Sequence, residues 1–324
     1  MISDEYRKLY HYTTWDGSIG ILKTQSLWAT HYKFLNDYTE LALFRNRLVQ
    51  YIAPAVREQF VTLVKHRKDV KREIERQGGI EHVVQHDAMS IVNAAYSATG
   101  EDIYIASFCG EDKNEYVNRN GLLSQWRGYG SGGGVALVFD TKKLEEILKL
   151  EAERYSYDLG LFADVIYSDD EAKLKRELSD GLKEISAYVS RMLLDMSLNR
   201  IEPPDATNVF PAFIKAISRY KHQGFKEENE VRIVCLPTNV DEEYLRIAKE
   251  RNASTKPEKE PKARLKRGKL VPYIDLFDST DNVLPIERAI IGPHIDKELR
   301  ASFLRAMFRK SKFEVTVSDI PYVE

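Results

Sequence analysis

The sequence predicts an α+β fold, and two observations lead to this prediction. Short apolar runs that are rich in β-branched residues and bounded by turn residues recur along the 324-residue chain. Between them lie long segments whose apolar residues repeat at helical spacing. Strands scattered among helices in this way favour a single α+β domain over residues 1–324, with helical insertions near 41–98 and 170–220.

The elements follow from the order of these patterns. Thr14 is a suitable N-cap for a first helix, and Pro54 and the Gly78-Gly79 pair are expected to break the long helical segment 41–98. Strands are predicted at 9–13, 27–30, 103–109, 135–140, 165–167, 225–236, 289–291 and 313–317. Helices are predicted at 14–23, 41–98, 144–154 and 170–199.

The composition excludes several classes of protein. An apolar share of 43% and a net charge of −2 are typical of a globular protein with ample core and no general attraction to nucleic acid or anionic membranes. The chain begins without an apolar signal region and has no run long enough to span a bilayer, so we expect a cytoplasmic protein without a membrane partner. Its oligomeric state stays open.

The two cysteines, Cys109 and Cys235, lie far apart in apolar strand-like runs. This placement indicates buried free thiols in a reducing compartment and gives no basis for a disulfide framework or a zinc site. We expect no metal cofactor.

Residues 249–269 form a basic segment, with nine lysines and arginines against three glutamates. This local excess of six leaves the rest of the chain with a charge of about −8, that is, −2 minus 6. The segment could contact nucleic acid phosphates. Because Pro257 and Pro261 interrupt it and no aromatic residue is interleaved, we predict a flexible, solvated loop.

The strand predicted at 225–236 carries an unusual set of charges. Alternation would place Glu228, Glu230 and Arg232 on one face and Val231 on the apolar face behind them. Neighbouring carboxylates raise one another's pKa, and such pairs are enriched at functional sites. A solvated strand face with a local Glu–Arg ion pair accounts for the pattern equally well.

Two further patterns could bind a ligand. In the first strand His11 and Thr13 share one face, which suits binding to ribose hydroxyls, and Ser107 ends a later strand. Around residue 126, Trp126, Arg127 and Tyr129 combine aromatic faces with a guanidinium beside a glycine-rich stretch. An interior histidine with a sheet threonine, and a hairpin turn with an aromatic anchor, are the structural alternatives.

Taken together, the motifs resemble a bacterial family of unassigned function, the domain-of-unknown-function family 2971. The resemblance runs in order over nearly the whole chain and supplies no activity. Its motifs are Leu9–Thr13, Leu27–Thr30, Phe34–Asp37 with Glu40, Ser107-Phe108, Gln125–Arg127 with Tyr129-Gly130, Gly134–Asp140, Phe225 with Glu228, Glu230 and Arg232, Ile290–Pro293, and Ile320–Tyr322.

More distantly, the chain is similar to the ADP-ribosyltransferase fold, which implies a split β-sheet core. His11 with Thr13 would match the histidine-type opening that holds an NAD ribose, and Ser107 or Tyr129 would take the central role. Glu228-Asn229-Glu230 looks like the E-x-E of the arginine-type branch. This mixture of two branches leaves the central residue and the target unassigned.

The resemblance implies an NAD-consuming ADP-ribosyltransferase or NAD glycohydrolase, of the toxin or phage-defence kind. NAD would be the substrate, and the acceptor would be a protein, a nucleic acid or water. Glu230 would stabilise the positive charge on the ribose and Glu228 would orient the acceptor. The residues expected to bind the dinucleotide are His11, Tyr12, Thr13, Asn36, Ser107, Trp126, Arg127, Tyr129 and Arg232.

Two other functions stay open from the sequence. The same residues could form a sensor that binds a nucleotide or a nucleic-acid end without turnover. Alternatively, the basic segment could make the chain a regulator that binds nucleic acid.

Overall fold

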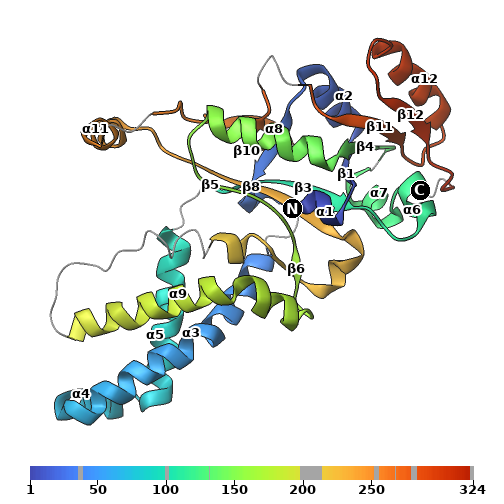
Figure 1. Cartoon of the computed structure of the whole chain (residues 1–324). Coiled ribbons are helices and arrows are strands. Elements are labelled where there is room, and N and C mark those ends of the chain that lie inside the picture. The colour runs from blue at the N-terminus through green and yellow to red at the C-terminus, as the bar shows by residue number, and fades with distance from the viewer. Residues whose placement is uncertain are drawn as a thin grey trace. The chain divides into compact units, whose positions relative to one another are not determined.

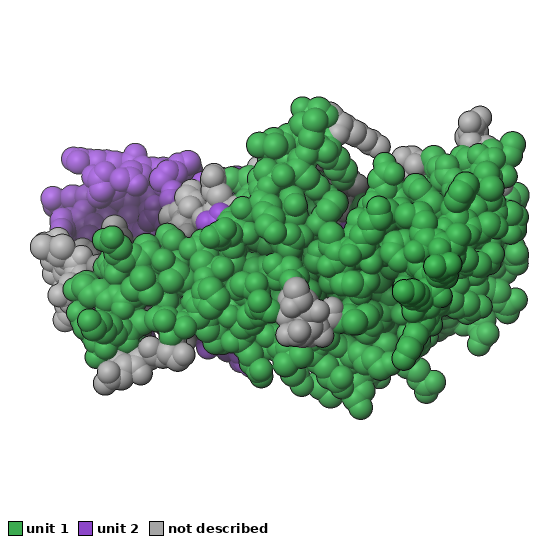
Figure 2. Space-filling view, turned by 90° about the horizontal axis from the view of Figure 1, so that it is seen from above, with its two compact units in different colours: residues 1–35, 103–165, 224–324 green, residues 36–102, 166–223 purple. Residues whose placement is uncertain are grey.

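The computed structural model describes residues 1–35, 39–98, 102–130, 132–197, 214–251, 255–266, 268–278 and 283–321. The chain divides into two compact units (Figure 2). The first comprises residues 1–35, 103–165 and 224–324, and the second comprises residues 36–102 and 166–223. The segments predicted as helical insertions, near 41–98 and 170–220, fall within the ranges of the second unit. Among the described helices, none has the length and apolar character needed to cross a bilayer.

The first unit is built on a ten-stranded sheet that mixes parallel and antiparallel pairs (Figure 1). The main strand order is β12-β11-β4-β1-β3-β2-β10-β9, while β8 pairs with β3 and β5 pairs with β8. The strands are β1 (Lys8–Thr13), β2 (Leu27–His31), β3 (Tyr104–Gly110), β4 (Val135–Asp140), β5 (Tyr157–Asp164), β8 (Glu230–Pro237), β9 (Lys262–Lys266), β10 (Lys269–Leu276), β11 (Ile286–Ile291) and β12 (Glu314–Val317).

The buried strands at the centre of this sheet confirm the sequence prediction. In β4, Val135 to Phe139 are all buried, as expected for a strand covered on both faces. In β8, Val231, Ile233 and Cys235 point to the main core, as their alternation predicts. Cys109 and Cys235 are buried free cysteines. The α+β class is therefore confirmed.

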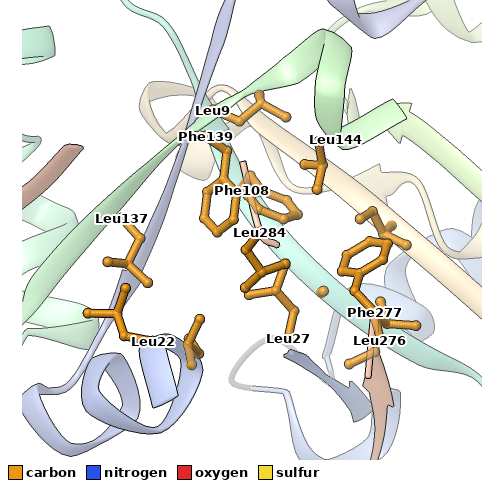
Figure 3. Packing of buried hydrophobic residues seen from close by; sticks show 14 of the residues in the cluster. Leu9, Leu22, Leu27, Phe108, Leu137, Phe139, Leu144, Leu276, Phe277 and Leu284 are labelled. Atoms are coloured by element: carbon orange, nitrogen blue, oxygen red, sulfur yellow. The ribbon is translucent and has the colours of Figure 1, made fainter. Parts of the chain in front are cut away.

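One face of the sheet packs a large apolar core (Figure 3). Leu9, Phe108 and Phe139 come from neighbouring strands, and the rings of Phe108 and Phe139 meet edge to face at 5.6 Å. Leu22 and Leu144 reach the same core from helices. The helices of this unit are α1 (Ile2–Glu5), α2 (Trp15–Thr24), α6 (Glu115–Asn120), α7 (Leu123–Tyr129), α8 (Thr141–Arg154), α11 (Glu242–Glu250) and α12 (Lys297–Met307).

Side-chain caps begin two of these helices. Thr14 accepts a hydrogen bond from the amide of Gly17 at the start of α2, as predicted, and Asp140 accepts one from Lys143 at the start of α8. Each cap directly follows or ends a strand, so the chain turns from sheet to helix without a long loop.

The second unit is mainly helical. It contains α3 (Thr39–His66), α4 (Lys68–Arg76), α5 (Ile80–Ala98) and α9 (Glu171–Ser197), with a short parallel pair of β6 (Ile166–Tyr167) and β7 (Tyr220–Lys221). The predicted break at Pro54 is wrong, because α3 continues through it. Leu48, Ile52 and Val56 are buried on this helix, and their packing outweighs the hydrogen bond that proline removes.

The basic segment is not the flexible loop that its composition predicts. Residues 262–266 form β9 and pair with β10. Earlier in the segment the Lys259 ammonium is 3% exposed and lies 2.8 Å from Glu151 and 2.7 Å from Asp278. It also contacts the Tyr155 ring at 3.8 Å. A count of charges in the segment cannot show that Lys259 is buried or that residues 262–266 form a strand, because both depend on contacts with residues outside the segment.

Candidate functional site

The sheet of the first unit splits along β3. One edge of β3 pairs with β1 at Cys109 and Gly110 and with β2 at Tyr104 and Ile105. Residues 106–108 lie between these two contacts, and among the described strands they pair with β8 alone. We call this place, where β1 and β2 part along residues 106–108, the β3 fork.

His11 occupies the fork. Its Nδ1 lies 2.9 Å from the carbonyl oxygen of Ser107, where a strand amide would otherwise bind, and its ring lies 5.6 Å from that of Phe108. Because a carbonyl oxygen only accepts, Nδ1 donates, and Nε2 of the neutral ring is left as an acceptor. Burial, together with the nearby charge of Arg264, lowers the pKa of His11 below 6.5. The fork therefore presents a neutral imidazole that can accept a hydrogen bond from a hydroxyl group.

A row of polar side chains crosses the sheet at the fork. Ser107 lies opposite Arg232 of β8, so the two share one face of the sheet. Thr30 lies opposite Ile105, which is two residues before Ser107, so its side chain is on that face as well. In β3 Ser107 is partly exposed, while every other residue of this strand is buried.

Glu230 and Arg232 form a buried ion pair next to this row. The Arg232 Nε donates to one Glu230 oxygen at 2.7 Å and Nη2 donates to the other at 3.0 Å, with both residues 5–6% exposed. Such a two-point contact fixes the carboxylate and guanidinium in a common plane. The ion pair anticipated as a structural alternative is therefore present, and it is buried rather than solvated.

Glu228 does not lie on the strand that carries Glu230, which corrects the strand predicted at 225–236. It ends the 3₁₀ helix η2 (Gln223–Glu228), and Asn229 then adopts a left-handed conformation with φ 46°. Asn229 is held there because its side chain accepts from the Tyr6 hydroxyl and donates to the carbonyl of Glu111. This turn interrupts the period of two that the sequence pattern assumes.

Glu228 instead borders a small pocket of the first unit. Tyr10, Tyr12, Cys109 and Asn118 are among the other residues that line it. Burial raises the pKa of Tyr10 to about 12, and its hydroxyl donates to the carbonyl of Asn118. The pocket lining therefore combines two phenols with the carboxylates of Asp112, Glu227 and Glu228.

The Trp126 region forms a short helix, α7, and not the hairpin turn considered above. Trp126 is 4% exposed, its indole nitrogen donates to the carbonyl of Asn120, and its ring meets that of Tyr12 edge-on at 4.9 Å. The Tyr12 hydroxyl in turn accepts from the amide of Leu122. Both rings are buried in the packing of this face, and Tyr12 also lines the small pocket.

The remaining predicted residues are Thr13 on β1, Arg127 and Tyr129 on α7, and Asn36. Thr13 ends β1 opposite Val135, and it shares the face of His11 by alternation. On α7, Arg127 is exposed and Tyr129 is partly buried against the Tyr12–Trp126 cluster. Asn36 lies outside the described residues.

Arg264 is a site residue that the sequence interpretation missed. It lies on β9, donates to the Thr30 hydroxyl at 3.2 Å and affects the pKa of His11 electrostatically. The alternation of Lys262, Arg264 and Lys266 before a glycine turn is a weak strand signal that could have identified it. Because the segment is rich in charged residues, this alternation was not interpreted as a strand.

A comparison with known protein families finds a match for part of the chain. Residues 125–233 match the model of a family described as a protein of unknown function (DUF2971). This span, about a third of the chain, supports the relationship expected from the motifs and includes Trp126, Glu230 and Arg232. No curated protein and no solved structure matches the chain.

Proposed function

We propose that the chain is an NAD-consuming ADP-ribosyltransferase or NAD glycohydrolase that binds the dinucleotide at the β3 fork. The observation that carries this proposal is the His11–Ser107 contact between two parting strands. A split sheet with an opening-strand histidine at the split is what the similarity to the ADP-ribosyltransferase fold implies. The proposed roles rest on the placement of the surrounding groups.

His11 and Ser107 would bind the nicotinamide ribose. The Nε2 of neutral His11 can accept a hydrogen bond from a ribose hydroxyl, and the Ser107 hydroxyl can donate or accept. Ser107 borders the fork, whereas Tyr129 lies on α7 and packs with Trp126. The position of Ser107 in β3 at the fork supports giving it the central role.

Glu230 would stabilise the reacting centre. In the reaction the bond between the ribose C1′ and the nicotinamide nitrogen breaks, and the bonding electrons leave with nicotinamide. The cationic ribose is then attacked by an acceptor oxygen or nitrogen, which loses a proton to solvent. A preorganised carboxylate lowers the energy of the oxocarbenium-like transition state.

A specific observation favours a second candidate, a sensor that binds the dinucleotide without cleaving it. Both carboxylate oxygens of Glu230 contact Arg232, and the pair is almost fully buried. A carboxylate neutralised in this way contributes less to the stabilisation of a cation. Binding and turnover must therefore be measured separately.

The test is release of nicotinamide from NAD by the purified full chain, compared with Glu230→Gln. Amide substitution keeps one hydrogen bond to Arg232 and removes the charge, so we expect a loss of about a hundredfold or more in rate. NAD should still raise the melting temperature of the variant. Glu228→Gln is measured in parallel, because a loss of rate in this variant would support the acceptor-orienting role expected of Glu228.

Loss of one partner of a buried ion pair can also unfold the protein, so the double variant Glu230→Gln/Arg232→Met is measured in parallel. If it is folded, binds NAD and is inactive, the assignment of Glu230 stands. Full activity in Glu230→Gln would exclude the catalytic role. If the wild-type chain is stabilised by NAD but releases no nicotinamide, the sensor is the function.

A further inference from the structure

Arg264 stands beside the fork on a surface made by three strands. Within the sheet, Arg264 of β9 lies opposite Val271 of β10, and Tyr273 of β10 lies opposite Thr30 of β2. Alternation places Val271 and Tyr273 on one face, so Arg264, Tyr273 and Thr30 project from the same side. The Arg264 Nη2 is 3.2 Å from the Thr30 hydroxyl, which fixes the direction of the guanidinium.

Two aromatic rings hold the guanidinium in place. Its central carbon lies 4.5 Å from the Trp28 ring and 5.7 Å from the Tyr273 ring, and the two rings are 5.2 Å apart. Arginine stacks on aromatic faces without losing the donors at the rim of its plane. The side chain is thereby preorganised, and its donors point outward from the rings.

Arg264 lacks an anionic partner among the described residues. No acidic side chain lies within ion-pair distance of it, although Lys262 on the same strand pairs with Asp275 at 2.7 Å. Its Nε is buried without a hydrogen-bond acceptor. Burial lowers the pKa of Arg264. An anionic ligand would supply both the missing negative charge and a hydrogen-bond acceptor for Arg264.

We propose that Arg264, oriented by Thr30 and Trp28, binds the pyrophosphate of the dinucleotide whose ribose lies at His11. This inference rests on the proposed function and assigns the phosphate-binding part of the same site. The sequence prediction included two arginines, Arg127 and Arg232, among the residues that bind the dinucleotide, and it did not include Arg264. Arg232 is already engaged by Glu230, and Arg127 is exposed on α7.

Calorimetric titration of the full chain with ADP and with inorganic pyrophosphate tests this subsite without requiring turnover. We expect Arg264→Gln to weaken the binding of both by about tenfold or more, since a charge-assisted two-point contact is lost. Arg264→Lys should recover binding only in part, because an ammonium cannot make the planar contact. Lys262→Gln is the matched control, with the same charge removed two residues away, and it should bind as the wild type does.

The outcomes separate this inference from the proposed function. If ADP binding depends on Arg264 and no nicotinamide is ever released, the subsite stands and the enzyme proposal fails. If NAD is cleaved but Arg264→Gln binds ADP and pyrophosphate like the wild type, the subsite is excluded. Arg264-dependent binding of a single-stranded oligonucleotide, without binding of ADP, would also overturn it. Equal melting temperatures of the variants and the wild type would show that weaker ADP binding does not come from unfolding of the variant.

Discussion

His11 completes a hydrogen bond that the strands around it leave open. Where β1 and β2 part, the carbonyl of Ser107 has no strand amide opposite it, and the Nδ1 of His11 takes that place. A buried carbonyl without a donor would cost about 1–3 kcal/mol. The same side chain thus stabilises the split and offers its second nitrogen to a ligand.

The lowered pKa of His11 makes part of the stability dependent on pH. In the folded chain the pKa of His11 is below 6.5, so below that pH the unfolded chain binds more protons at this position. The stabilisation is fully present above about pH 7 and is lost as the pH falls below 6.5 toward the folded pKa. In His11→Gln, which keeps a donor for Ser107, we expect a smaller loss of stability between pH 7.5 and pH 5.5.

Urea unfolding at both pH values measures this difference. Other groups titrate in the same range, so the comparison is between the variant and the wild type, not between two pH values of one protein. An identical loss of stability in both proteins would contradict the assignment of a shifted histidine. Arg264→Gln should raise the pKa of His11, which nuclear magnetic resonance can follow at the imidazole protons.

Among the elements, α7 shows how packing decides a structure that local sequence leaves ambiguous. Gly128 and Gly130 lower the helix propensity of this segment, yet Trp126 and Gln125 are buried and the helix forms. Two glycines outside the helix make room for the indole. A Cβ on Gly121 would lie 2.5 Å from the Trp126 ring, and one on Gly292 would lie 2.7 Å from it.

Alanine substitutions at two glycines of this region should act in opposite directions. Gly121 has φ +79° and contacts Trp126, so Gly121→Ala should lower the free energy of unfolding by at least about 1–2 kcal/mol. Gly128 lies within α7 with no atom near the added Cβ, so Gly128→Ala should raise it by about 0.5–1 kcal/mol. Thermal unfolding of the two variants and the wild type decides this. A stabilising effect at Gly121 would mean that the indole is not anchored there.

The elements that could be predicted from the sequence are those with a strong local signal. β4, β1 and α2 are found where apolar alternation or the Thr14 cap predicts them. β5 was missed because Gly160 and its exposed positions weaken the pattern, although β8 pairs along its length. β9 was missed because its strand character comes from pairing with β10 and not from apolar residues.

The candidate site was predictable only in part, for a similar reason. His11, Ser107, Glu230 and Arg232 could be selected because each has a recognisable residue type on a strand. Arg264 could not be selected, because it lies more than 250 residues from His11 in sequence and affects the pKa of His11 through the folded sheet. The left-handed Asn229, which separates Glu228 from Glu230, is held by Tyr6 and Glu111, and both lie more than 100 residues away in sequence.

At the scale of the whole molecule, β3 is the strand of the first unit's sheet that pairs with three others. β3 bonds to β1 and β2 on one edge and to β8 on the other, whereas β9 is the last strand at one end of the order. The residues of β3 are almost all buried, and four of the five residues of β9 are exposed. Local opening should therefore begin at β9 and reach β3 only with the unfolding of this unit.

Hydrogen exchange measured by mass spectrometry tests this order within the first unit. Peptides that cover residues 104–110 should exchange last, and peptides that cover residues 262–266 should exchange early. Binding of ADP should slow exchange in β9 if Arg264 contacts it. Equal rates in the two strands would mean that the sheet opens as one body.

The position of β9 also bears on how the protein behaves at high concentration. A strand at the end of a sheet offers backbone donors and acceptors to any other chain and is a common starting point of aggregation. Here Lys262 and Lys266 lie along that strand, and Leu265 between them is 75% exposed. Two copies that met edge to edge would bring their ammonium groups together, and this repulsion weakens as salt screens it. We therefore expect the lysines of β9 to disfavour edge-to-edge association of two copies in dilute buffer. Concentrated salt should weaken this repulsion and so favour association through β9.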